Sequence, residues 1–587
     1  METKNLIIAI ALSAAILIAW TYFFQGPQLA KQQAQQQAAQ QAQQAQQAQQ
    51  PAQPAAQQPA PQEGGRQVAS RDEALKESPR VAIDTPRLKG SIALKGARLD
   101  DLVLKNYRET VEPDSPNVIL LSPLNTQDAY YADVGWSADS KDISLPTADT
   151  VWQADGDQLA PGKPVTLTWD NGQGLTFSRK VEIDDNYLFT VTDTVTNSGG
   201  EPVELSSYGR VVHYGTPPHA SQSYVLHEGP IGVFDGALTE EKYSSVKSAA
   251  EKNENPAYPS TGGWMGNADK YWLVAQIPPQ DEKLTGHIFY DPKGDFYQID
   301  YVADKKQVPA GGSVTHQQHV FAGAKVLNIL AGYRDQLGAV HFDRAIDFGW
   351  YWFFTKPLFV IIDTIYRYVG NFGIAIMCLT VLVKACMFPL ANKAYRSMSR
   401  MKLLQPKMTE LREKFGDDRN KLNQEMMALY KREKVNPAAG CLPVVVQIPV
   451  FYSLYKVIYV TIEMRHAPFF GWIKDLSAPD PTSILNLFGL IPWDYHVLFT
   501  LPLVGAVAHL LSIGIWPLIM GLTMWLQMRL NPTPPDPVQA RIFGLMPIIF
   551  TFMLAPFNAG LIIYWAWNNT LSIAQQKLIM WRMGVKT

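Results

Sequence analysis

The sequence predicts a polytopic α-helical membrane protein that also carries a large all-β sandwich domain. Apolar runs that are long enough, or nearly long enough, to cross a bilayer recur between residue 372 and the C-terminus. Between residues 80 and 338, apolar and polar residues alternate, which is typical of β-strands. Lys and Arg gather in one loop of the apolar region and are scarce in the next loop, which is the asymmetry that orients membrane helices.

The first apolar run covers residues 6–24. It is longer than the core of a signal peptide, and no small-residue cleavage site follows it. A cleaved signal peptide is the alternative, but the pattern favours a retained span, so we assign residues 1–26 to an N-terminal transmembrane anchor. The next stretch consists mainly of Gln, Ala and Pro and cannot bury a core, which predicts a disordered linker over residues 27–79.

The β domain is predicted over residues 80–342. Its clearest signal is a hairpin, in which Asn171-Gly172 turns the chain between two alternating segments and Leu175 and Phe177 lie on the return strand. Three histidines are close in the sequence but lack the spacing of metal ligands, namely His213, His219 and His227. With no catalytic constellation in this region, a binding or structural role is favoured over an enzyme active site.

Lys384 interrupts an apolar run of about 19 residues that starts at Phe372. A charge inside a membrane helix is costly and needs a reason. One reason is snorkelling, because Lys384 lies roughly 7–8 Å from the end of the run at Pro389 and its stem could reach the headgroups. The other is a water-filled pocket within the membrane that uses the charge. Thr380 is four residues away and shares its helix face.

The most basic loop follows this run. Residues 391–434 contain twelve Lys or Arg, whereas residues 463–508 contain two. The first loop also has apolar residues every three or four positions, so we expect a helical hairpin over residues 391–436 with a narrow apolar seam, which Pro406 kinks or restarts. By the positive-inside rule this hairpin and both termini are cytoplasmic. The β domain is then outside, in the periplasm of a bacterium with two membranes.

With the anchor, six spans fit this orientation. Residues 372–587 are expected to form a five-span core, with spans at 372–390, 441–462, 509–528, 542–554 and 561–573. Two further apolar stretches do not cross. Residues 343–371 read as an interfacial amphipathic helix, and residues 484–509 as a re-entrant or interfacial segment. Lys456 lies in the outer part of its span and is expected to snorkel outward.

Polar residues inside the spans are the functional candidates. Each of them either forms a hydrogen bond between helices or lines a polar cavity. The candidates are Thr380, Gln447, Gln527, Thr551, Asn568 and Asn569. No Asp or Glu occurs in the five predicted spans, which argues against a proton-coupled transporter. No nucleotide-binding, metalloprotease or serine-hydrolase motif is present. A lone cation without a carboxylate points to attraction of anionic groups with no catalytic residue, metal or cofactor.

Four stretches of this sequence resemble the YidC-type (YidC/Oxa/Alb) bacterial membrane protein insertases: KVNPAAGCLPVVVQIPVFYSLY, MSRMKLLQPKM, DLSAPDP and MPIIFTFMLAPFNAGLIIYWAWNN. The order of anchor, Gln-rich tether, β domain and helical core is also similar. Two departures matter. Most of the family has Arg where this chain has Lys384, and its last turn usually reads Phe-Pro-(Ser/Ala)-Gly, whereas this chain has Asn558 after Phe557. Residues 484–512 also look longer than in many members.

The resemblance implies a hydrophilic groove that is open to cytoplasm and lipid. It would be lined or bordered by Thr380, Lys384, Gln447, Gln527, Trp565 and Asn568. The hairpin would dock the ribosome or signal-recognition machinery through Arg396, Arg400, Lys402, Lys407 and Arg412. The implied activity is ATP-independent insertion and chaperoning of nascent membrane proteins in contact with lipid, alone or with the Sec translocon and its accessory subunits, and without sequence-specific nucleic acid binding. The rivals are a solute or lipid transporter and an assembly scaffold whose β domain is the working part.

Overall fold

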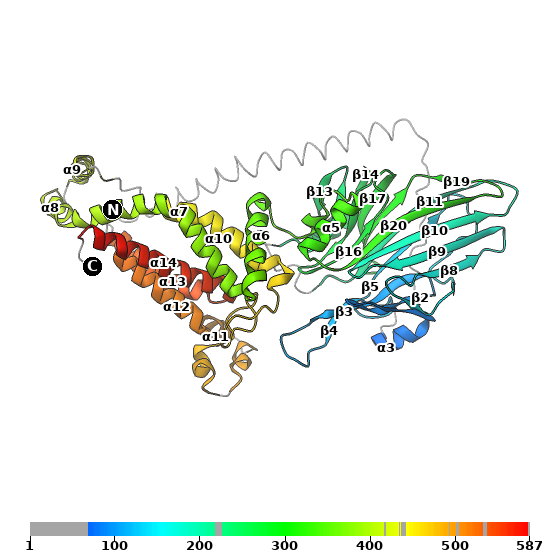
Figure 1. Ribbon diagram of the computed structural model, residues 1–587, viewed down its shortest axis with the longest axis horizontal. Helices are drawn as coiled ribbons and strands as arrows, with labels where there is room; N and C mark the ends of the chain where they lie inside the picture. The colour runs from blue at the N-terminus through cyan, green and yellow to red at the C-terminus, as the bar shows by residue number, and fades with distance from the viewer. Residues whose placement is uncertain are drawn as a thin grey trace. The chain divides into compact units, whose positions relative to one another are not determined.

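The computed structural model describes residues 69–217, 226–415, 418–433, 435, 442–491, 493–500, 504–531 and 537–584. The predicted anchor and most of the predicted linker lie outside these residues, as does His219. The described chain begins with short helices α3 (Arg71–Ala74) and η2 (Leu75–Glu77), continues as a β-rich part, and ends as a helical part (Figure 1).

Two sheets make up the β-rich part, and the predicted sandwich is confirmed. Among the described residues, the first sheet has eleven strands. In order across the sheet they are β14 (Ala257–Thr261), β17 (Lys283–Asp291), β18 (Phe296–Ala303), β11 (Val203–Tyr214), β5 (Tyr130–Ser137), β3 (Arg98–Arg108), β2 (Leu88–Ala93), β1 (Arg80–Asp84) and β7 (Gln158–Leu159), with β4 (Asn117–Leu121) paired to β3 and β19 (Lys306–Val308) paired to β11.

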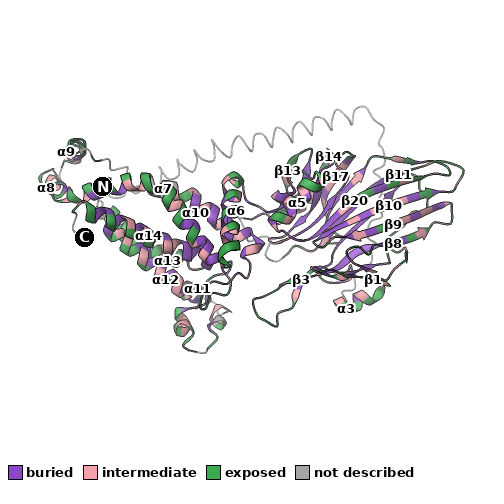
Figure 2. Ribbon diagram, in the orientation of Figure 1, coloured by how far each residue is buried: buried purple, intermediate pink, exposed green. Residues whose placement is uncertain are grey.

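The second sheet has nine strands within the described chain. Their order is β13 (Ala237–Glu240), β12 (Gly229–Phe234), β15 (Trp264–Ala268), β16 (Trp272–Ile277), β20 (Ser313–Ala324), β10 (Leu188–Asn197), β9 (Leu175–Ile183), β8 (Val165–Asp170) and β6 (Gln153–Ala154). Three short helices accompany the sheets, namely α4 (Tyr243–Glu251), α5 (Leu327–Leu337) and η3 (Phe342–Ala345). Figure 2 shows that the strands of the sandwich are largely buried.

The predicted hairpin is present as β8 and β9, which pair antiparallel with Val165 opposite Val181. Gly172 has a φ of +68°, a conformation that glycine adopts without the steric cost that a side chain brings. Along β9 the residues alternate between buried and half-buried or exposed positions, beginning with buried Leu175 and Phe177. The period-two pattern in the sequence therefore reports the core-facing side of this strand.

Two buried ion pairs lie inside the sandwich and were not predicted. The Arg179 guanidinium donates to both carboxylate oxygens of Asp193 at 2.7 and 2.9 Å. Arg210 does the same with Asp133 at 2.6 and 2.8 Å. Removing one partner of such a pair would leave an uncompensated buried charge, so each pair fixes how the strands around it pack.

The helical part begins with α6 (Trp352–Val369), at the position where the sequence predicts an interfacial helix. The remaining elements are α7 (Phe372–Leu403), α8 (Gln405–Phe415), α9 (Arg419–Arg432), α10 (Leu442–Val460), η5 (Ile462–Met464), η6 (Ile484–Gly489), η7 (Tyr495–Thr500), α11 (Val504–Leu511), α12 (Ile515–Leu530), α13 (Pro537–Leu554) and α14 (Ala559–Arg582). Pro406 restarts the chain as α8 immediately after α7 ends, and α8 and α9 form the predicted helical hairpin.

Within the described residues, α7 is the one helix that is both long and apolar enough to cross a membrane, with 32 residues. Asn371 caps its start by accepting a hydrogen bond from Ile374 N at 3.1 Å. The helix continues past Pro389, so the apolar run and the first basic residues belong to one rod. The predicted count of five spans stays a prediction.

The run predicted as one span over residues 509–528 is not one helix. It is divided between α11 and α12 by a break at residues 512–514. The start of α12 is held by another loop, because Asp480 Oδ2 accepts Trp516 N at 2.9 Å and Thr482 Oγ1 accepts Ile515 N at 3.0 Å. Hydropathy alone does not show this break, since the residues around it are apolar on both sides.

Helix α14 packs against both α7 and α12, and α13 packs against α12. The indole N–H of Trp567 on α14 donates to the Met377 carbonyl of α7 at 3.3 Å. Helices α12 and α13 approach closely at Gly521, where a Cβ would lie 2.1 Å from Thr551 Oγ1. These contacts place α14 between the helix that carries Lys384 and the helix that carries Gln527.

The expectation that Lys456 snorkels outward is wrong. Its side chain is 2% exposed, and its ammonium pairs with Asp347 Oδ2 at 2.7 Å. The same carboxylate accepts backbone N–H bonds from His227 and Gly349, each at 2.8 Å. Although burial alone would raise the pKa of the Asp347 carboxyl, the Lys456 ammonium holds it below its usual range. The Lys456 ammonium is therefore paired with a carboxylate 109 residues away in the sequence, and not with lipid headgroups.

Candidate functional site around Lys384

Lys384 lies on α7 and is half-buried. Its ammonium donates to the hydroxyl oxygen of Ser572 on α14 at 2.6 Å, and Ser572 is 2% exposed. The charged group is therefore turned toward the contact between two helices rather than toward the end of the apolar run. This direction favours the pocket interpretation of Lys384 over snorkelling.

One face of α14 is polar and buried. Asn568, Ser572 and Gln576 follow one another at intervals of four residues, so they share a face, and all three are buried. Ser572 donates to the Asn568 carbonyl at 2.7 Å, and Gln576 Nε2 donates to the Leu530 carbonyl at 3.1 Å. A polar stripe of this length is unusual in an apolar helix and lies directly beside the cation.

Two acceptors on this stripe have no hydrogen-bond partner among the described protein atoms. They are the side-chain oxygens Asn568 Oδ1 and Gln576 Oε1. Buried amide oxygens are normally satisfied by protein or by water. The stripe can therefore accept hydrogen bonds from water or from a polar segment that enters beside Lys384.

The other predicted site residues lie on four helices. Thr380 is buried and donates to its own helix at the Ile376 carbonyl, at 2.7 Å. Gln447 on α10 donates to the Tyr564 hydroxyl on α14. Gln527 is half-buried on α12 and is joined to the others through the packing of α12 on α14.

The indole of Trp565 contacts aromatic rings on two other helices. Its ring centroid lies 4.7 Å from that of Phe451 on α10 and 5.9 Å from that of Phe550 on α13. Trp565 and Gln447 thus bring α10 and α14 together at a level different from that of Lys384. The structure joins Lys384 to the Asn568 face through Ser572, and it gives Thr380 and Gln527 no direct bond to the cation among the described contacts.

The sequence reasoning missed Ser572 and Gln576. A usable signal was present, because both continue the four-residue spacing from Asn568 within an apolar helix. Asn569 was a candidate, and its amide donates to Thr523 on α12 at 3.3 Å, which is the interhelical role that single polar residues usually have.

The charge of Lys384 has no carboxylate to balance it in the described chain. None of α7, α10, α12, α13 and α14 contains Asp or Glu. The one side-chain partner found for the Lys384 ammonium among the described residues is the neutral Ser572. In a low-dielectric site such a cation attracts carboxylates strongly, at about 4 kcal/mol for 4 Å and an effective dielectric constant of 20.

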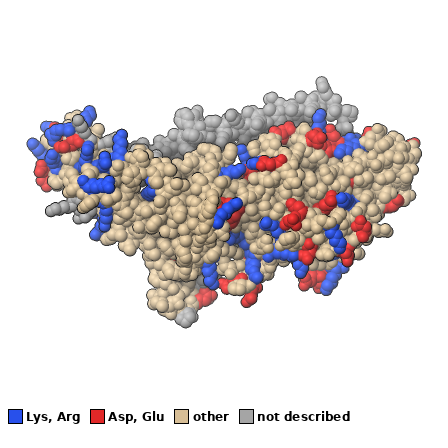
Figure 3. All heavy atoms as spheres, viewed as in Figure 1, with Lys and Arg blue, Asp and Glu red and all other residues tan. Residues whose placement is uncertain are grey.

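The basic hairpin is built on an apolar seam between α8 and α9. The buried members of this seam are Leu404, Met408, Met426, Leu429, Tyr430 and Val435. Of the predicted docking residues, Arg396 and Arg400 are exposed on the last turns of α7, and Lys402 and Arg412 are half-buried. Lys407 is exposed and pairs with Glu433 at 2.9 Å. Figure 3 shows Lys and Arg gathered at this end of the helical part.

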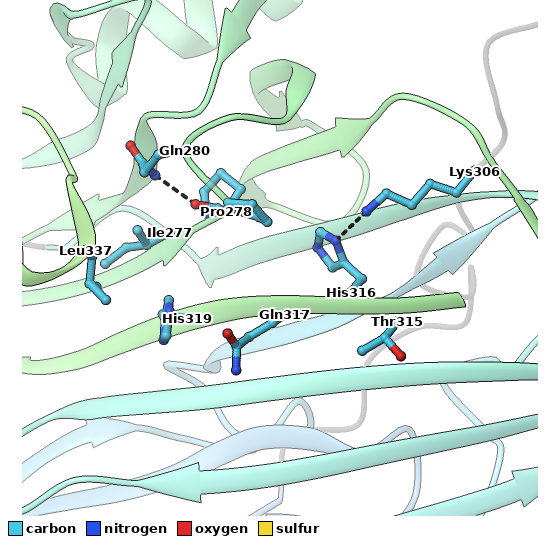
Figure 4. A pocket seen from close by; sticks show the side chains of 10 residues that line it. Ile277, Pro278, Gln280, Lys306, Thr315, His316, Gln317, His319 and Leu337 are labelled. Carbon is cyan, nitrogen blue, oxygen red and sulfur yellow. Dashed lines mark hydrogen bonds between the residues drawn. The ribbon is translucent and has the colours of Figure 1, made fainter. Parts of the chain in front are cut away.

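A polar hollow also opens on the β sandwich (Figure 4). Its volume is about 250 Å³, and its lining includes Lys306, His316 and His319. The carboxylate of Glu282 faces the first two groups, with its oxygens 2.6 Å from Lys306 Nζ and 3.2 Å from His316 Nδ1. The hollow therefore offers hydrogen-bonding groups, and its lysine already has a carboxylate partner.

The structure describes two of the three histidines singled out in the sequence, His213 and His227. No group of three potential metal ligands comes together among the described residues. Burial lowers the pKa of His213 and of His227 to about 4, so both imidazoles are neutral at pH 7. Both side chains are half-buried, and the preference for a binding or structural role in this region stays a prediction.

Comparisons with known proteins cover the whole chain. Residues 80–361 match the family model described as the YidC periplasmic domain, and residues 364–586 match the model of the 60Kd inner membrane protein. The chain is 54% identical to the membrane protein insertase YidC of Brucella suis biovar 1 over 607 residues, covering 100% of this chain and 97% of that one. The chain belongs to the YidC family of membrane protein insertases.

A second relative and one solved structure are also similar to this chain. The YidC of Bradyrhizobium diazoefficiens is 51% identical, again over 100% of this chain and 97% of its own. A crystal structure of an active YidC insertase with its first transmembrane domain resolved is 16% identical, with a TM-score of 0.35, over 85% of this chain and 92% of that one. As a YidC family member, this chain is an inner membrane protein with a large periplasmic β sandwich, and its clients are nascent membrane proteins.

Proposed function

We propose that this protein inserts nascent inner-membrane proteins into the bilayer and helps them fold, without ATP. The observation that carries the proposal is Lys384, a cation on the membrane helix α7 that is turned onto a buried polar stripe with no carboxylate nearby among the described residues. Membership of the YidC family supplies the client class, and the cation supplies the means of holding it.

The proposed site is a hydrophilic groove, open to cytoplasm and lipid, between α7, α10, α12, α13 and α14. A polar outer segment of a client cannot cross hydrocarbon cheaply. Water in the groove would shorten the apolar barrier, and Lys384 would hold acidic residues of that segment for a time. The residues proposed to line or border the groove are Thr380, Lys384, Gln447, Gln527, Trp565 and Asn568, to which we add Ser572.

Release into the membrane would follow from burial of the client's own apolar helix. Exposed apolar side chains such as Ile448 on α10 and Ile548 on α13 offer a surface along which that helix can slide toward lipid. Burying its surface yields about 25 cal/mol per Å². The membrane potential would add roughly 2.3 kcal/mol per charge per 100 mV when it pulls acidic segments outward.

Lys384 suits brief binding better than the Arg found in most of the family. A guanidinium can hold a carboxylate through two parallel N–H bonds, whereas an ammonium acts as a point charge on a flexible stem. The hydrogen bond to Ser572 would restrain that stem while leaving two N–H donors of the ammonium for a client. Compared with Arg, Lys384 would still attract a client carboxylate, but it would not require the carboxylate to take one fixed orientation.

The proposal includes a topology and partners. The five helices α7, α10, α12, α13 and α14 would each cross the membrane, with the hairpin and both chain termini in the cytoplasm. Arg396 and Arg400, together with Lys402, Lys407 and Arg412, would dock ribosomal or signal-recognition components. Large clients would be inserted beside the Sec translocon, and small ones by this protein alone.

Reconstitution tests the proposed activity. Purified full-length protein in sealed liposomes should insert a small coat-like membrane protein without nucleotide, scored by protection of the client from external protease. Matched liposomes without the protein give the background. Solute flux without insertion would show that the protein is a transporter. If neither insertion nor flux occurs, the assembly scaffold would be the remaining interpretation.

A further inference from the structure

The loop between α10 and α12 carries an apolar surface that the proposed function does not use. Large side chains are exposed on its short helices η6 and η7 and on the residues between them, where Leu490 is 83% exposed. The exposed side chains, which we call the apolar tip, are Leu487, Leu490, Ile491, Trp493 and Val497. Five exposed large apolar side chains within eleven residues of one loop indicate a surface with a partner.

Hydrogen bonds within the loop fix the tip in this outward position. Leu487 and Phe488 have φ values of +47° and +59°, which bulky residues rarely adopt. The turn is closed by Phe488 N, which donates to the Ser483 carbonyl at 2.7 Å. The Trp493 indole N–H donates to the Leu485 carbonyl at 3.1 Å. The exposure of the tip is therefore part of a closed turn that tolerates unfavourable backbone angles.

The base of the loop is tied to the starts of two helices. Asp480 accepts the Trp516 N–H of α12 at 2.9 Å, and Ile484 N donates to the Ile513 carbonyl at 3.0 Å. The Ala478 carbonyl accepts Ala559 N at the start of α14, at 2.7 Å. Because the basic hairpin lies at the other ends of these helices, the tip is on the side of the membrane that carries the β sandwich.

The chemistry of the loop identifies the partner. Residues 484–513 contain no Lys or Arg and one acidic residue, Asp494. Helix α12 also exposes large apolar side chains, at Leu518 and Leu522. Figure 3 shows few charged side chains on this face of the helical part. A surface that carries a Trp and several large apolar side chains, with one carboxylate and no cation, matches the acyl chains just below the headgroups.

We infer that the apolar tip is inserted in the outer leaflet of the membrane and anchors the outward end of α12 there. The partner is the lipid bilayer itself, bound through apolar contact rather than through anionic headgroups. This inference does not depend on the insertion activity, because it concerns where the tip lies and not what the groove does.

Spin labelling tests the inference on the full-length protein in lipid nanodiscs. With Cys378, Cys386 and Cys441 replaced by Ser, a label is placed at Leu490→Cys. Labels at two other exposed sites serve as references. Leu522→Cys on α12 gives the value for a label in the bilayer, and Val151→Cys on the sandwich gives the value for a label in water. The ratio of collision rates with oxygen and with a water-soluble nickel complex should be several-fold higher at position 490 than at position 151. A ratio equal to that at 151, or shielding from both reagents, would overturn the inference.

Two further arms keep the test decisive. Nanodiscs with and without phosphatidylglycerol should give the same depth at position 490, and a depth that needs the anionic lipid would contradict binding through apolar contact. If the Leu490→Cys protein does not fold, as judged by thermal unfolding against the parent, Val497→Cys replaces it and must give the same result.

Discussion

Lys384 acts by charge in the proposed mechanism, which makes charge reversal informative. A cation and a carboxylate about 5 Å apart attract by about 3 kcal/mol at an effective dielectric constant of 20. Lys384→Glu should therefore reduce insertion of clients with acidic outer segments at least about tenfold. Lys384→Arg keeps the charge and should stay close to the parent. The measurement is protease protection in reconstituted liposomes.

The control for this prediction is the client. A client whose outer segment has no acidic residue should be inserted nearly equally by the parent, Lys384→Glu and Lys384→Arg proteins. Parent-level insertion of an acidic client by Lys384→Glu would remove the charge from the mechanism.

The buried pair of Lys456 and Asp347 predicts a stability effect. Asp347→Ala leaves the ammonium buried without its carboxylate, which should destabilise the protein by about 3–5 kcal/mol. Asp363→Ala is the matched control, because Asp363 pairs with the largely exposed Arg367 four residues on, and such pairs contribute about 0.3–0.5 kcal/mol. Thermal unfolding of the detergent-solubilised variants measures both.

A further variant separates charge from packing at this pair. Joining Asp347→Asn with Lys456→Met removes both charges and should recover most of the loss, since the cost arises from the unpaired ammonium. Equal melting temperatures for Asp347→Ala and Asp363→Ala would show that the pair contributes no more than a surface contact.

These two lysines also show what sequence can and cannot predict about a residue. A charge within an apolar run is visible at once, so Lys384 could be singled out from its neighbours alone. Its partner Ser572 lies 188 residues away, and the partner of Lys456 lies 109 residues away. Which helices meet, and at which turn, depends on tertiary packing, so snorkelling could be assigned to the wrong lysine.

At the scale of elements, the close approach of α12 and α13 predicts that Gly521 is intolerant of a side chain. A Cβ at Gly521 would lie 2.1 Å from Thr551 Oγ1, so Gly521→Ala should separate the two helices and destabilise the protein by about 1–3 kcal/mol. Gly544→Ala on α13 meets no atom within 4 Å and should be neutral or stabilising by up to about 1 kcal/mol. Thermal unfolding compares the two.

An equal response of both glycine variants would mean that α12 and α13 are not packed at this contact. The insertion activity of the Gly521→Ala protein is a second measurement, and it should fall because displaced helices would also change the proposed groove. The Gly544→Ala protein should insert clients like the parent, since its methyl group faces open space.

Elements were predictable where their local pattern agrees with their packing. The β8–β9 hairpin follows from alternation and a turn, both of which are local. The boundary between α11 and α12 was missed because Asp480 and Thr482, which lie more than thirty residues upstream, cap the start of α12. A hydropathy run records how apolar a segment is, and it does not record where another loop ends a helix.

On the scale of the whole molecule, one buried apolar cluster includes residues of both parts of the described chain, and polar and aromatic contacts also join the two parts. The Lys270 ammonium lies 3.9 Å from the ring centroid of Tyr459, and Arg465 donates to the Glu109 carbonyl at 3.1 Å. The His227 N–H donates to Asp347. None of these contacts involves Lys384 or the polar stripe of α14, so the proposed groove does not need the sandwich for its local geometry.

Deleting residues 80–338 should therefore leave insertion of small clients largely intact. Asp347 and Lys456 both remain, so their pair survives without the His227 donor, and α6 stays joined to α7. The variant should lose some thermal stability, because Tyr459 and Arg465 lose their partners. A companion deletion of residues 80–369 also removes α6 and Asp347 and should insert poorly, because it leaves Lys456 unpaired. Loss of insertion by a well-folded 80–338 deletion would move the active part into the sandwich.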